Sequence, residues 1–539
     1  MLKEILCPFF KHEKISFHDG LNIILGDDDA KNSIGKSTAL MVIDFVQGGN
    51  TFLEDDAGVI KNIGPHYYNF RFDFSGHSYY FSRSTDVSEV VYVCDNAYSK
   101  QGKLTIDDYR KKLAEFYGLE SLESSYRSVV SPFCRIWKKG GLEPDQPFVG
   151  APKEPSGAAI SRLIDLFGRS PDIAAERKVI DEQKARKKLI TGSMNEKIIP
   201  KINKAQYKEN TKTIAENSEK IEKFKQGFGG ALNAYEALFD ENLRRMQLQK
   251  NELTNLRNEL QNKIKRLQRE ISGITPRLAA NIALVAEYFS SVNVDRLEQV
   301  ESFHQKIGSI VKKELKDELT STQSQEVILA SECSSLEREI QTALESKGMP
   351  DDMFKRVFEL KESTDKAINE NSYFDKKVQL EEVIMLSNKR LSNIYTKIFL
   401  DIETKINAKL KAFNKVVYGP TRNSSELRIK SESSYSFTSP DDTGTGKSYA
   451  GLIGFDTAML SLTPLPFVIH DSVVYKNVEV AATKRILRIL AAMKAKQIFL
   501  SFDEAKKFGS QTEQRIKKFT ALKLSHNDLL YNKDWRDQK

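Results

Sequence analysis

The residues best suited to chemistry lie near the start of the chain, in the run Asn32-Ser33-Ile34-Gly35-Lys36-Ser37-Thr38. This run follows the apolar segment Leu21-Asn22-Ile23-Ile24-Leu25-Gly26, which predicts a buried strand. Where a strand turns into a helix, backbone N–H groups from Asn32 to Ser37 can surround a phosphate at the positive end of the helix. The Lys36 ammonium can reach the β- and γ-phosphates, and the Ser37 hydroxyl can bind Mg²⁺. Every residue of the run, Ile34, Gly35 and Thr38 included, is a candidate nucleotide-binding residue.

The spacing of this loop departs from the usual pattern G-x-x-x-x-G-K-[ST], because Ala30 stands where the first glycine is expected. Gly26 supplies a glycine earlier in the chain, so Asp27-Asp28-Asp29-Ala30 is interpreted as an insertion. Aspartates beside a phosphate would repel it, so we expect the insertion to bulge away from the site. The simpler alternative is a lysine at a helix start with no ligand. The position between a strand and a helix favours the phosphate-binding loop.

A second candidate site lies near the other end of the chain, in Phe467-Val468-Ile469-His470-Asp471-Ser472. Its apolar run predicts a buried strand that ends on a carboxylate, and carboxylate oxygen is a preferred Mg²⁺ ligand. Ser37 and Asp471 are therefore the candidate metal ligands. His470 is interpreted as a packed residue at the strand end. The two candidate sites are more than 400 residues apart, so they can form one site only if the chain folds back on itself.

A glycine-rich turn precedes this strand, in Asp442-Thr443-Gly444-Thr445-Gly446-Lys447-Ser448. Its last residues imitate a second phosphate loop, but the full pattern needs glycine at Asp441, so that interpretation is rejected. An apolar segment from Ala450 to Leu460 predicts a helix directly after the turn. A turn at a helix N-terminus can bind phosphate. The candidate residues for this contact are Thr443, Gly444, Thr445 and Gly446.

The elements that must position these residues are strands and helices in alternation. We expect mainly strands over residues 1–100, with a hairpin around Ser75-Gly76-His77, and a helix from Lys36 to Val46. Strands are also expected at 426–429 and 435–438, and at Gln497-Ile498-Phe499-Leu500-Ser501-Phe502. Asp503 follows the last of these strands and is either a helix N-cap or a polar residue of the site.

The middle of the chain has a different pattern, with apolar residues at steps of three and four and charged residues between them, from Phe239 to Ile274 and again from Leu329 to Phe413. This predicts an antiparallel coiled coil, although a compact helical bundle is the alternative. The predicted fold class is α/β, with a head split between the two chain ends and a coiled-coil insert. The predicted parts are 1–170 and 419–539 for the head, 171–202 for a helical connector, 203–275 and 305–418 for the arms, and 276–304 for the tip.

Composition excludes several classes of protein. No stretch of 18 apolar residues exists, so we expect no membrane span, and the first residues do not resemble a signal peptide. The four cysteines are scattered, which fits the reducing cytoplasm and excludes a cysteine zinc hook at the tip. The net charge of +8 is interpreted as spread along the chain, which permits contact with nucleic acid without demanding it.

Together the phosphate loop, the coil, the glycine-rich turn and the Ile469-His470-Asp471-Ser472 strand resemble the SMC, RecN and RecF group of ABC ATPases. The motifs are most similar to those of the short-coil SMC-like ATPases of bacterial antiphage ABC three-component systems. This resemblance implies binding of ATP and Mg²⁺. It also implies a homodimer with ATP sandwiched between heads, in which Gly444 and its neighbours bind the γ-phosphate held by the opposite subunit. DNA and an effector or adaptor protein are the other implied partners, and antiphage defence the implied role.

The sequence departs from that family at three places. Ser472 occupies the position of the catalytic glutamate, and a serine without a partner is no general base at neutral pH. The switch histidine expected after the next strand is missing, and Asp503 is the nearest polar residue. Asp503 or Glu479 could orient the water instead, so Asp471, Ser472 and Asp503 are the candidate catalytic residues. For the Q-loop, Ser131-Pro132-Phe133-Cys134-Arg135 and the nearby Gln146 both remain candidates.

These departures favour slow, Mg-dependent hydrolysis, or a nucleotide-gated scaffold with little turnover that recruits an effector. A DNA-repair ATPase of the RecN or RecF kind is a further alternative. Arg71, Arg83 and Lys138-Lys139 are weaker candidates for contacts to DNA phosphates, since basic side chains are usually solvated surface. Trp137 beside them is interpreted as a packing residue.

The first test concerns Lys36. Because its ammonium faces the phosphates, Lys36→Ala should weaken ATP binding by about 2–3 kcal/mol, the scale of a charge-assisted hydrogen bond. Isothermal titration calorimetry measures this directly. Equal affinity in both proteins would refute the site assignment.

Overall fold

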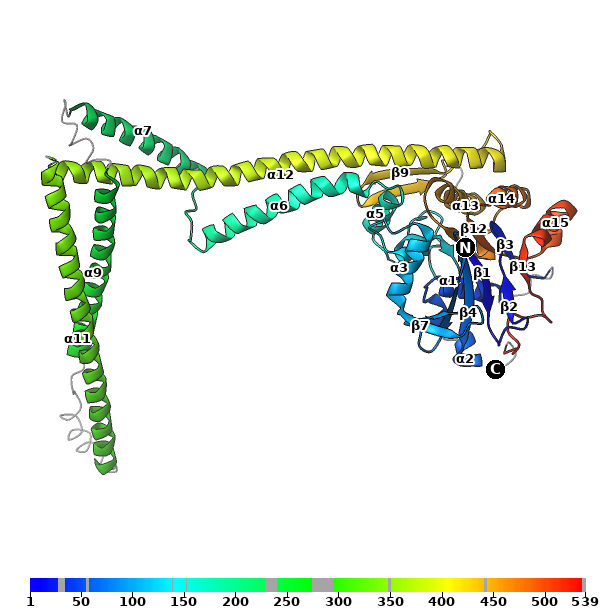
Figure 1. Cartoon of the computed structure of the whole chain (residues 1–539), viewed down its shortest axis with the longest axis horizontal. Helices are drawn as coiled ribbons and strands as arrows, with labels where there is room; N and C mark the ends of the chain where they lie inside the picture. The colour runs from blue at the N-terminus through cyan, green and yellow to red at the C-terminus, as the bar shows by residue number, and fades with distance from the viewer. Residues whose placement is uncertain are drawn as a thin grey trace. The chain divides into compact units, whose positions relative to one another are not determined.

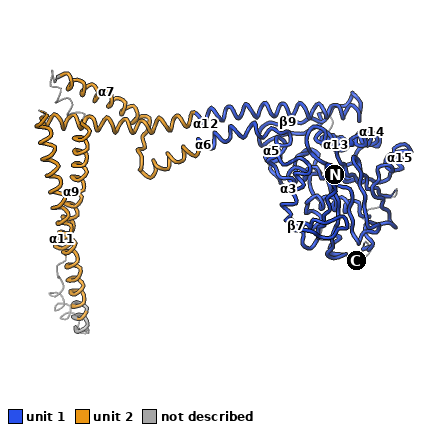
Figure 2. The backbone as a smooth tube through the Cα atoms, in the orientation of Figure 1, with its two compact units in different colours: residues 1–183, 383–539 blue, residues 184–382 orange. Residues whose placement is uncertain are grey.

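The computed structural model of the chain describes residues 1–27, 34–54, 58–137, 139–151, 153–227, 240–273, 294–347, 350–440 and 444–535. It divides the chain into two compact units, each described here by itself (Figure 2). The head unit comprises residues 1–183 and 383–539, and the arm unit comprises residues 184–382. The sequence predicts that the head ends at 170 and resumes at 419, whereas the unit boundaries fall inside helices α6 (Ser170–Asn195) and α12 (Asp351–Tyr418).

A parallel sheet forms the centre of the head unit (Figure 1). Its strand order is β13 (Thr520–Lys523), β3 (Leu21–Leu25), β12 (Gln497–Phe502), β11 (Phe467–His470) and β8 (Cys134–Arg135). All four strand pairs are parallel. Strands β3, β11 and β12 are buried along their whole length, as expected for parallel strands covered on both faces. The strands predicted at these three places are confirmed.

An antiparallel sheet built from the first 105 residues accompanies it. Its order is β2 (Lys14–Ser16), β1 (Leu2–Leu6), β4 (Tyr67–Phe74), β5 (His77–Ser84), β6 (Val90–Cys94) and β7 (Lys100–Thr105). Strands β4 and β5 form the predicted hairpin, with Phe74 paired to His77 around the turn. Tyr68, Phe70 and Phe72 alternate along β4 and are fully buried, so one face of this sheet belongs to the core.

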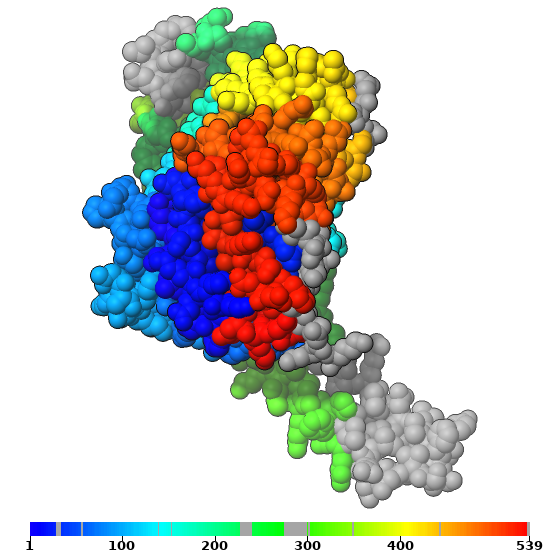
Figure 3. Space-filling model, turned by 90° about the vertical axis from the view of Figure 1, so that its right-hand side faces the viewer, coloured from blue at the N-terminus to red at the C-terminus, as the bar shows by residue number. Residues whose placement is uncertain are grey.

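The two ends of the chain lie side by side in the head unit, and Figure 3 shows the first strands (blue) beside the C-terminal segment (red). Phe10 and Tyr531 form an antiparallel bridge. The Leu524 amide donates to the Leu25 carbonyl at 2.8 Å, and the Lys11 amide donates to the Leu530 carbonyl at 3.0 Å. The head therefore needs both chain ends, as predicted.

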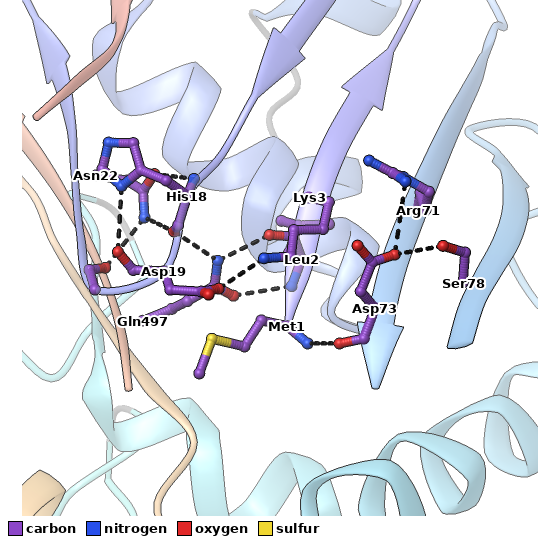
Figure 4. Close-up of polar contacts among 11 residues, drawn as sticks. Met1, Leu2, Lys3, His18, Asp19, Asn22, Arg71, Asp73, Ser78 and Gln497 are labelled. Atoms are coloured by element: carbon purple, nitrogen blue, oxygen red, sulfur yellow. Dashed lines mark hydrogen bonds and ion pairs between the residues drawn. The ribbon is translucent and has the colours of Figure 1, made fainter. Parts of the chain in front are cut away.

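The buried side chain of Gln497 ties the two sheets together (Figure 4). Its Oε1 accepts from the Leu2 amide at 2.9 Å, and its Nε2 donates to the carbonyl groups of Leu2 at 2.8 Å and His18 at 3.2 Å. Asn22 holds the same turn, because its Nδ2 donates to the His18 carbonyl at 2.8 Å. These bonds satisfy backbone groups that burial would otherwise leave unpaired.

Helices surround the sheets of the head unit. They are α1 (Lys36–Val46), α2 (Val59–Ile63), α3 (Ile106–Tyr117), α4 (Tyr126–Val130), α5 (Ser156–Leu166), α13 (Thr445–Leu462), α14 (Val480–Ala492) and α15 (Ser510–Lys518). Short 3₁₀ turns are η1 (Thr51–Glu54), η2 (Ser131–Phe133), η3 (Ser472–Val474) and η4 (Ala505–Phe508). A separate hairpin pairs β9 (Glu426–Ser431) with β10 (Ser434–Thr438). Helix α1 has the bounds predicted from the sequence.

The last part of α12 differs from the sequence prediction. The pattern of its apolar stripe predicts part of the descending coiled-coil arm, but the structure packs the stripe into the core of the head unit. The buried residues of this stripe are Tyr395, Ile398, Phe399, Ile402, Ile406, Leu410, Phe413 and Val417. A stripe of period 3.6 predicts an amphipathic helix but does not identify the surface that covers it.

The arm unit consists of long helices. Helices α9 (Glu241–Gly273) and α11 (Val294–Ser346) run antiparallel side by side (Figure 1). Leu243, Ile340 and Leu344 form a small core with Phe354 and Phe358 of α12. Helix α7 (Lys204–Gly227) packs on α12 instead, since the Asn210 Nδ2 donates to Asn371 Oδ1 at 3.2 Å. The predicted tip lies largely outside the described residues. No described helix is both long enough and apolar enough to cross a membrane.

Candidate functional site

Gly35, at the start of α1, is the part of the predicted phosphate-binding loop whose backbone geometry is described. Gly35 is the N-cap residue and has φ +102°, a left-handed conformation that favours glycine. A Cβ added there would lie 2.7 Å from the Cβ of Leu530, so the C-terminal segment packs against this turn. Ile34 is buried, while Ser37 and Thr38 are partly exposed. Asn32, Ser33 and the inserted residues Asp28 to Ala30 lie outside the described residues.

Lys36 makes an ion pair with Asp503, with Nζ 2.7 Å from Oδ1. Both side chains are largely buried, at 9% and 14% exposure. Asp503 follows β12, the strand beside β3, so the pair joins the two chain halves. A Cβ added at Gly26 would overlap Asp503 Oδ1 and lie 3.2 Å from Lys36 Nζ. The ion pair therefore occupies space that a side chain at position 26 would fill. The alternative that Asp503 caps a helix is wrong, because Glu504 is the N-cap residue of η4.

Asp471 lies at the carboxyl end of β11 and is 2% exposed. Its Oδ1 accepts from the Ser501 hydroxyl at 2.8 Å and from the Ser472 amide at 2.7 Å. Its Oδ2 accepts from the Trp137 amide at 3.2 Å. These donors orient the carboxylate at the end of the strand. Carboxylate oxygen is a preferred ligand of Mg²⁺.

Lys36 and Asp471 belong to the same edge of the parallel sheet. One strand, β12, separates β3 from β11, so the two strands are about 10 Å apart across the sheet, twice the spacing of neighbouring strands. Along β12, β3 ends beside Phe502 and β11 ends beside Leu500, so β3 runs two residues further toward the same edge. Ligands of open α/β sheets bind at this carboxyl edge. A nucleotide triphosphate with its metal spans such a separation.

Ser472 has no environment that would make it a base. Its amide donates to Asp471 Oδ1 and to the Ser501 hydroxyl oxygen at 2.8 Å, and its own hydroxyl is 3.4 Å from Asp471 Oδ1. Glu479 is more than half exposed and forms an ion pair with Arg422 at 3.0 Å. Of the two carboxylates considered as replacements for the missing glutamate, Asp503 is therefore the one that contacts a site residue.

The glycine-rich turn leads directly into α13. Gly444 is the N-cap residue, and both Gly444 and Thr445 are exposed, whereas Thr443 lies outside the described residues. Gly446 is in contact with the chain itself, because a Cβ there would overlap the Asn477 carbonyl oxygen. Lys447 is buried and binds Asn414, with its ammonium 4.3 Å from the centre of the Tyr418 ring. Residues 446–448 are therefore no second phosphate loop, as the sequence indicated.

The donors present fit a nucleotide with Mg²⁺. Among the described residues, no group of three or more His, Cys, Asp or Glu side chains could hold a metal by itself. Mg²⁺ is commonly held by one or two carboxylates together with substrate phosphates, and Asp471 with the Ser37 hydroxyl supplies that kind of set. The left-handed Gly35 provides the close backbone approach that a phosphate needs.

The structure contradicts two weaker interpretations of the sequence, a DNA contact by Arg83 and the packing of Trp137. Arg83 is fully buried and donates to the carbonyl groups of Phe45 at 2.7 Å and Gly49 at 2.8 Å, so it does not reach DNA. Trp137 is 56% exposed rather than packed. Lys139 binds the buried Asp44 at 2.7 Å, and Lys138 lies outside the described residues. Arg71 is partly exposed and lies beside Glu4 and Asp73.

The two Q-loop candidates lie in different surroundings. The 131–135 segment forms η2 and β8, and the Arg135 carbonyl accepts from the Asp471 amide at 2.8 Å. Gln146 is exposed on the loop that follows. The first segment is therefore the one in contact with the candidate metal ligand. His470 is fully buried, which confirms that it is a packed residue.

Sequence reasoning missed two buried polar groups near the site, Ser501 and Asp44. Ser501 contacts Asp471, and a lone serine within an otherwise apolar strand was the available signal. Asp44 on α1 is fully buried and pairs with Arg127 and Lys139, each at 2.7 Å. Burial alone would raise the pKa of Asp44, but Arg127 and Lys139 outweigh burial and hold it well below its usual range. No signal in the sequence identified Asp44, since an aspartate on a helix is usually solvated.

Comparison with known proteins gives matches of two kinds. A family model described as "Uncharacterised protein conserved in bacteria (DUF2326)" matches residues 413–533, which include the glycine-rich turn, Asp471 and Asp503. No curated protein matches the sequence. Among solved structures, the chain is similar to the Smc head domain with a coiled coil and joint from Pyrococcus yayanosii, with 14% identity and a TM-score of 0.38, over 95% of this chain and 93% of that one.

A second similar structure is the Smc head domain from Pyrococcus furiosus, which has an extended coiled coil and is bound to the C-terminal domain of ScpA. Its identity to this chain is 12% and its TM-score is 0.35, over 96% of this chain and 91% of that one.

Four substitutions test the roles of three carboxylates and of Ser472. We expect Asp471→Asn to abolish ATP hydrolysis because the metal is no longer held, and Ser472→Ala to change it little. Asp503→Asn should alter the rate because it releases Lys36, whereas Glu479→Gln, at an exposed ion pair, should leave it unchanged. Steady-state ATPase assays measure all four. A fast ATPase rate in the unmodified protein that falls sharply in Ser472→Ala alone would show that Ser472 is catalytic.

Proposed function

We propose that the head unit is an SMC-like ATPase head that binds ATP and Mg²⁺. The observation that carries this proposal is the meeting of Lys36 and Asp471, from opposite chain ends, at one edge of one parallel sheet. Lys36 stands at the N-terminus of α1, where backbone N–H groups and the helix dipole favour a phosphate. Asp471 and Ser37 supply oxygen ligands for Mg²⁺.

Two copies of the head sandwich two ATP molecules in this proposal. The exposed Gly444 and Thr445 begin α13, an 18-residue helix, and the positive end of its dipole favours an anion. Each turn then binds the γ-phosphate that the other copy holds, and association follows ATP binding. The resemblance noted from the sequence suggests that an effector protein acts with this complex in defence against phage.

A second candidate function is a nucleotide-gated scaffold with little turnover. Ser472 favours it, because its amide and hydroxyl are directed to Asp471 and Ser501 and no acidic side chain occupies its position. Without a carboxylate to orient water, hydrolysis relies on positioning and Mg²⁺ alone. ATP binding would then hold the dimer long enough to recruit a partner.

DNA is the partner that the charge distribution supports. The interpretation of an evenly spread charge is wrong: residues 476–523 hold 12 Lys and Arg against 4 Asp and Glu, which equals the net charge of +8 of the whole chain. The rest of the chain, with 70 of each, is neutral. This basic segment covers α14, η4 and α15, on the C-terminal part of the head that Figure 3 displays in orange and red. Such a surface attracts nucleic-acid phosphates.

The dimer is tested at Gly444, whose φ of −63° suits any residue, so a new side chain adds bulk without backbone strain. At saturating Mg²⁺ we expect Gly444→Leu to bind ATP as tightly as the unmodified protein but to lose ATP-dependent association in light scattering. Gly446 is a poorer choice because its substitution would disturb the packing against Asn477. Association that survives in Gly444→Leu would show that the turn does not engage a second copy.

DNA binding is tested by neutralising four exposed residues of the basic segment, Arg488, Lys494, Lys518 and Lys523, with glutamine. The matched control neutralises four exposed lysines elsewhere on the head unit, Lys61, Lys103, Lys111 and Lys430. Fluorescence anisotropy with duplex DNA should show weaker binding only in the first variant. The slope of log affinity against log salt should become shallower by about 0.9 for each DNA phosphate that the variant no longer neutralises. Equally weakened binding in both variants would mean that net charge, not this surface, determines the affinity.

A further inference from the structure

Arg135 lies fully buried at the end of β8, and its side chain joins three parts of the head unit. Its Nε donates to Asp456 Oδ2 at 3.0 Å, and one terminal nitrogen donates to Asp456 Oδ1 at 2.8 Å. The terminal nitrogens also donate to the carbonyl groups of Gly141 and Pro147. The guanidinium thus binds a helix and a loop at once, with the planar geometry that arginine offers.

Asp456 is the fully buried centre of this contact, in the middle of α13. Its Oδ2 also accepts from His470 Nε2 at 2.9 Å. His470 Nδ1 lies 2.9 Å from the Tyr475 hydroxyl, so the ring bridges Asp456 and Tyr475. Burial would raise the pKa of Asp456, but Arg135 and His470 hold it below its usual value. The carboxylate is therefore charged and fully paired.

The cluster of Arg135, Asp456, His470 and Tyr475 surrounds the element that carries Asp471. His470 precedes Asp471 in the chain, and the Arg135 carbonyl accepts from the Asp471 amide at 2.8 Å. Tyr475 ends the turn that follows Asp471, since its amide donates to the Ser472 carbonyl at 3.0 Å. Asn477, two residues later, packs against Gly446 in the first turn of α13. Helix α13 is thus attached to this strand and turn at its start and at its centre.

We propose that this buried cluster couples the Gly444–Gly446 turn to Asp471, so that contact of the turn with a second copy of the chain is transmitted to the metal-binding carboxylate. The proposal rests on the proposed function, because it assigns a use to the ATP site and to the dimer contact. Asp456 and Tyr475 are positioning residues in it. Through this cluster each subunit links the nucleotide that it binds to the nucleotide that its turn contacts in the partner.

The coupling arises because α13 is attached at more than one position to the strand and turn that carry Asp471. A buried ion pair contributes little net stability compared with apolar packing, but its geometry is narrow. A displacement of α13 moves Asp456, and the bidentate contact moves Arg135 with it. Arg135 lies two residues before Trp137, whose amide holds Asp471 Oδ2. The orientation of the carboxylate thereby depends on the position of the turn.

The test is a double-mutant cycle on the Mg²⁺ concentration that half-saturates binding of a fluorescent, non-hydrolysable ATP analogue. The four proteins are the unmodified chain, Gly444→Leu, Tyr475→Phe and the double variant. Loss of engagement in Gly444→Leu should raise the Mg²⁺ midpoint at least about fivefold, a typical coupling between sites. In the Tyr475→Phe background the same substitution should add less than about twofold, because Tyr475 then no longer holds His470, which contacts Asp456 and precedes Asp471.

Tyr126→Phe is the matched control, since Tyr126 is also a buried tyrosine of the head unit, and its hydroxyl donates to Gln47 Oε1 at 2.7 Å outside the cluster. In that background Gly444→Leu should still raise the midpoint at least about fivefold. Asp456→Asn provides a second test, because it alters the contact made by the other ring nitrogen of His470. If Asp456→Asn does not fold, the cycle with Tyr475→Phe decides alone.

Three outcomes separate the proposals. Effects of Gly444→Leu and Tyr475→Phe that simply multiply would overturn the coupling and leave the cluster a packing feature. A midpoint unchanged by Gly444→Leu in the unmodified protein would also overturn it, while ATP binding itself would still support the proposed function. Absence of Mg²⁺-dependent ATP binding in the unmodified protein would overturn both.

Discussion

Strand β12 is the element on which the head unit depends, because it pairs with β3 on one side and with β11 on the other. These ladders join residues from the two ends of the chain and set both candidate site segments at one edge of the sheet. Ser501 and Asp503, two residues apart on this strand and its end, contact Asp471 and Lys36 respectively. One strand therefore orients both halves of the site, and displacement of β12 would separate them.

Buried charge organises the surroundings of this edge. Asp44 pairs with Arg127 and Lys139, and Asp456 pairs with Arg135, with both carboxylates held by more than one donor. Such clusters contribute little net stability compared with apolar packing, but an unpaired member would be very costly. Their effect is to restrict where α1, α13 and the segment after β8 can lie. The charges of the core therefore act on geometry more than on stability.

The chemistry of the site follows from what stands beside the carboxylate. The Ser472 amide and the Ser501 hydroxyl orient the Asp471 carboxylate, whereas the side chain of Ser472 is no carboxylate that could orient water. Lys36 forms an ion pair with Asp503. A bound phosphate must therefore either replace Asp503 beside the Lys36 ammonium or share the ammonium with it. Under the proposed function, such an arrangement would favour nucleotide binding over hydrolysis, and this is why the gated scaffold is a second candidate beside the ATPase.

The sequence by itself determined the local elements: strand β3, the bounds of α1, the β4–β5 hairpin and the carboxylate that ends β11 all follow from short patterns of apolar residues and glycines. These elements depend on neighbours in the chain, so the sequence contains the information. Only the tertiary structure decided which distant residues of the chain contact each other. It placed the stripe of α12 in the head core, buried Arg83, exposed Trp137 and joined Asp456 to Arg135 across more than 300 residues. Contacts between distant residues depend on the packing of the whole chain, and residue type and local spacing carry no record of it.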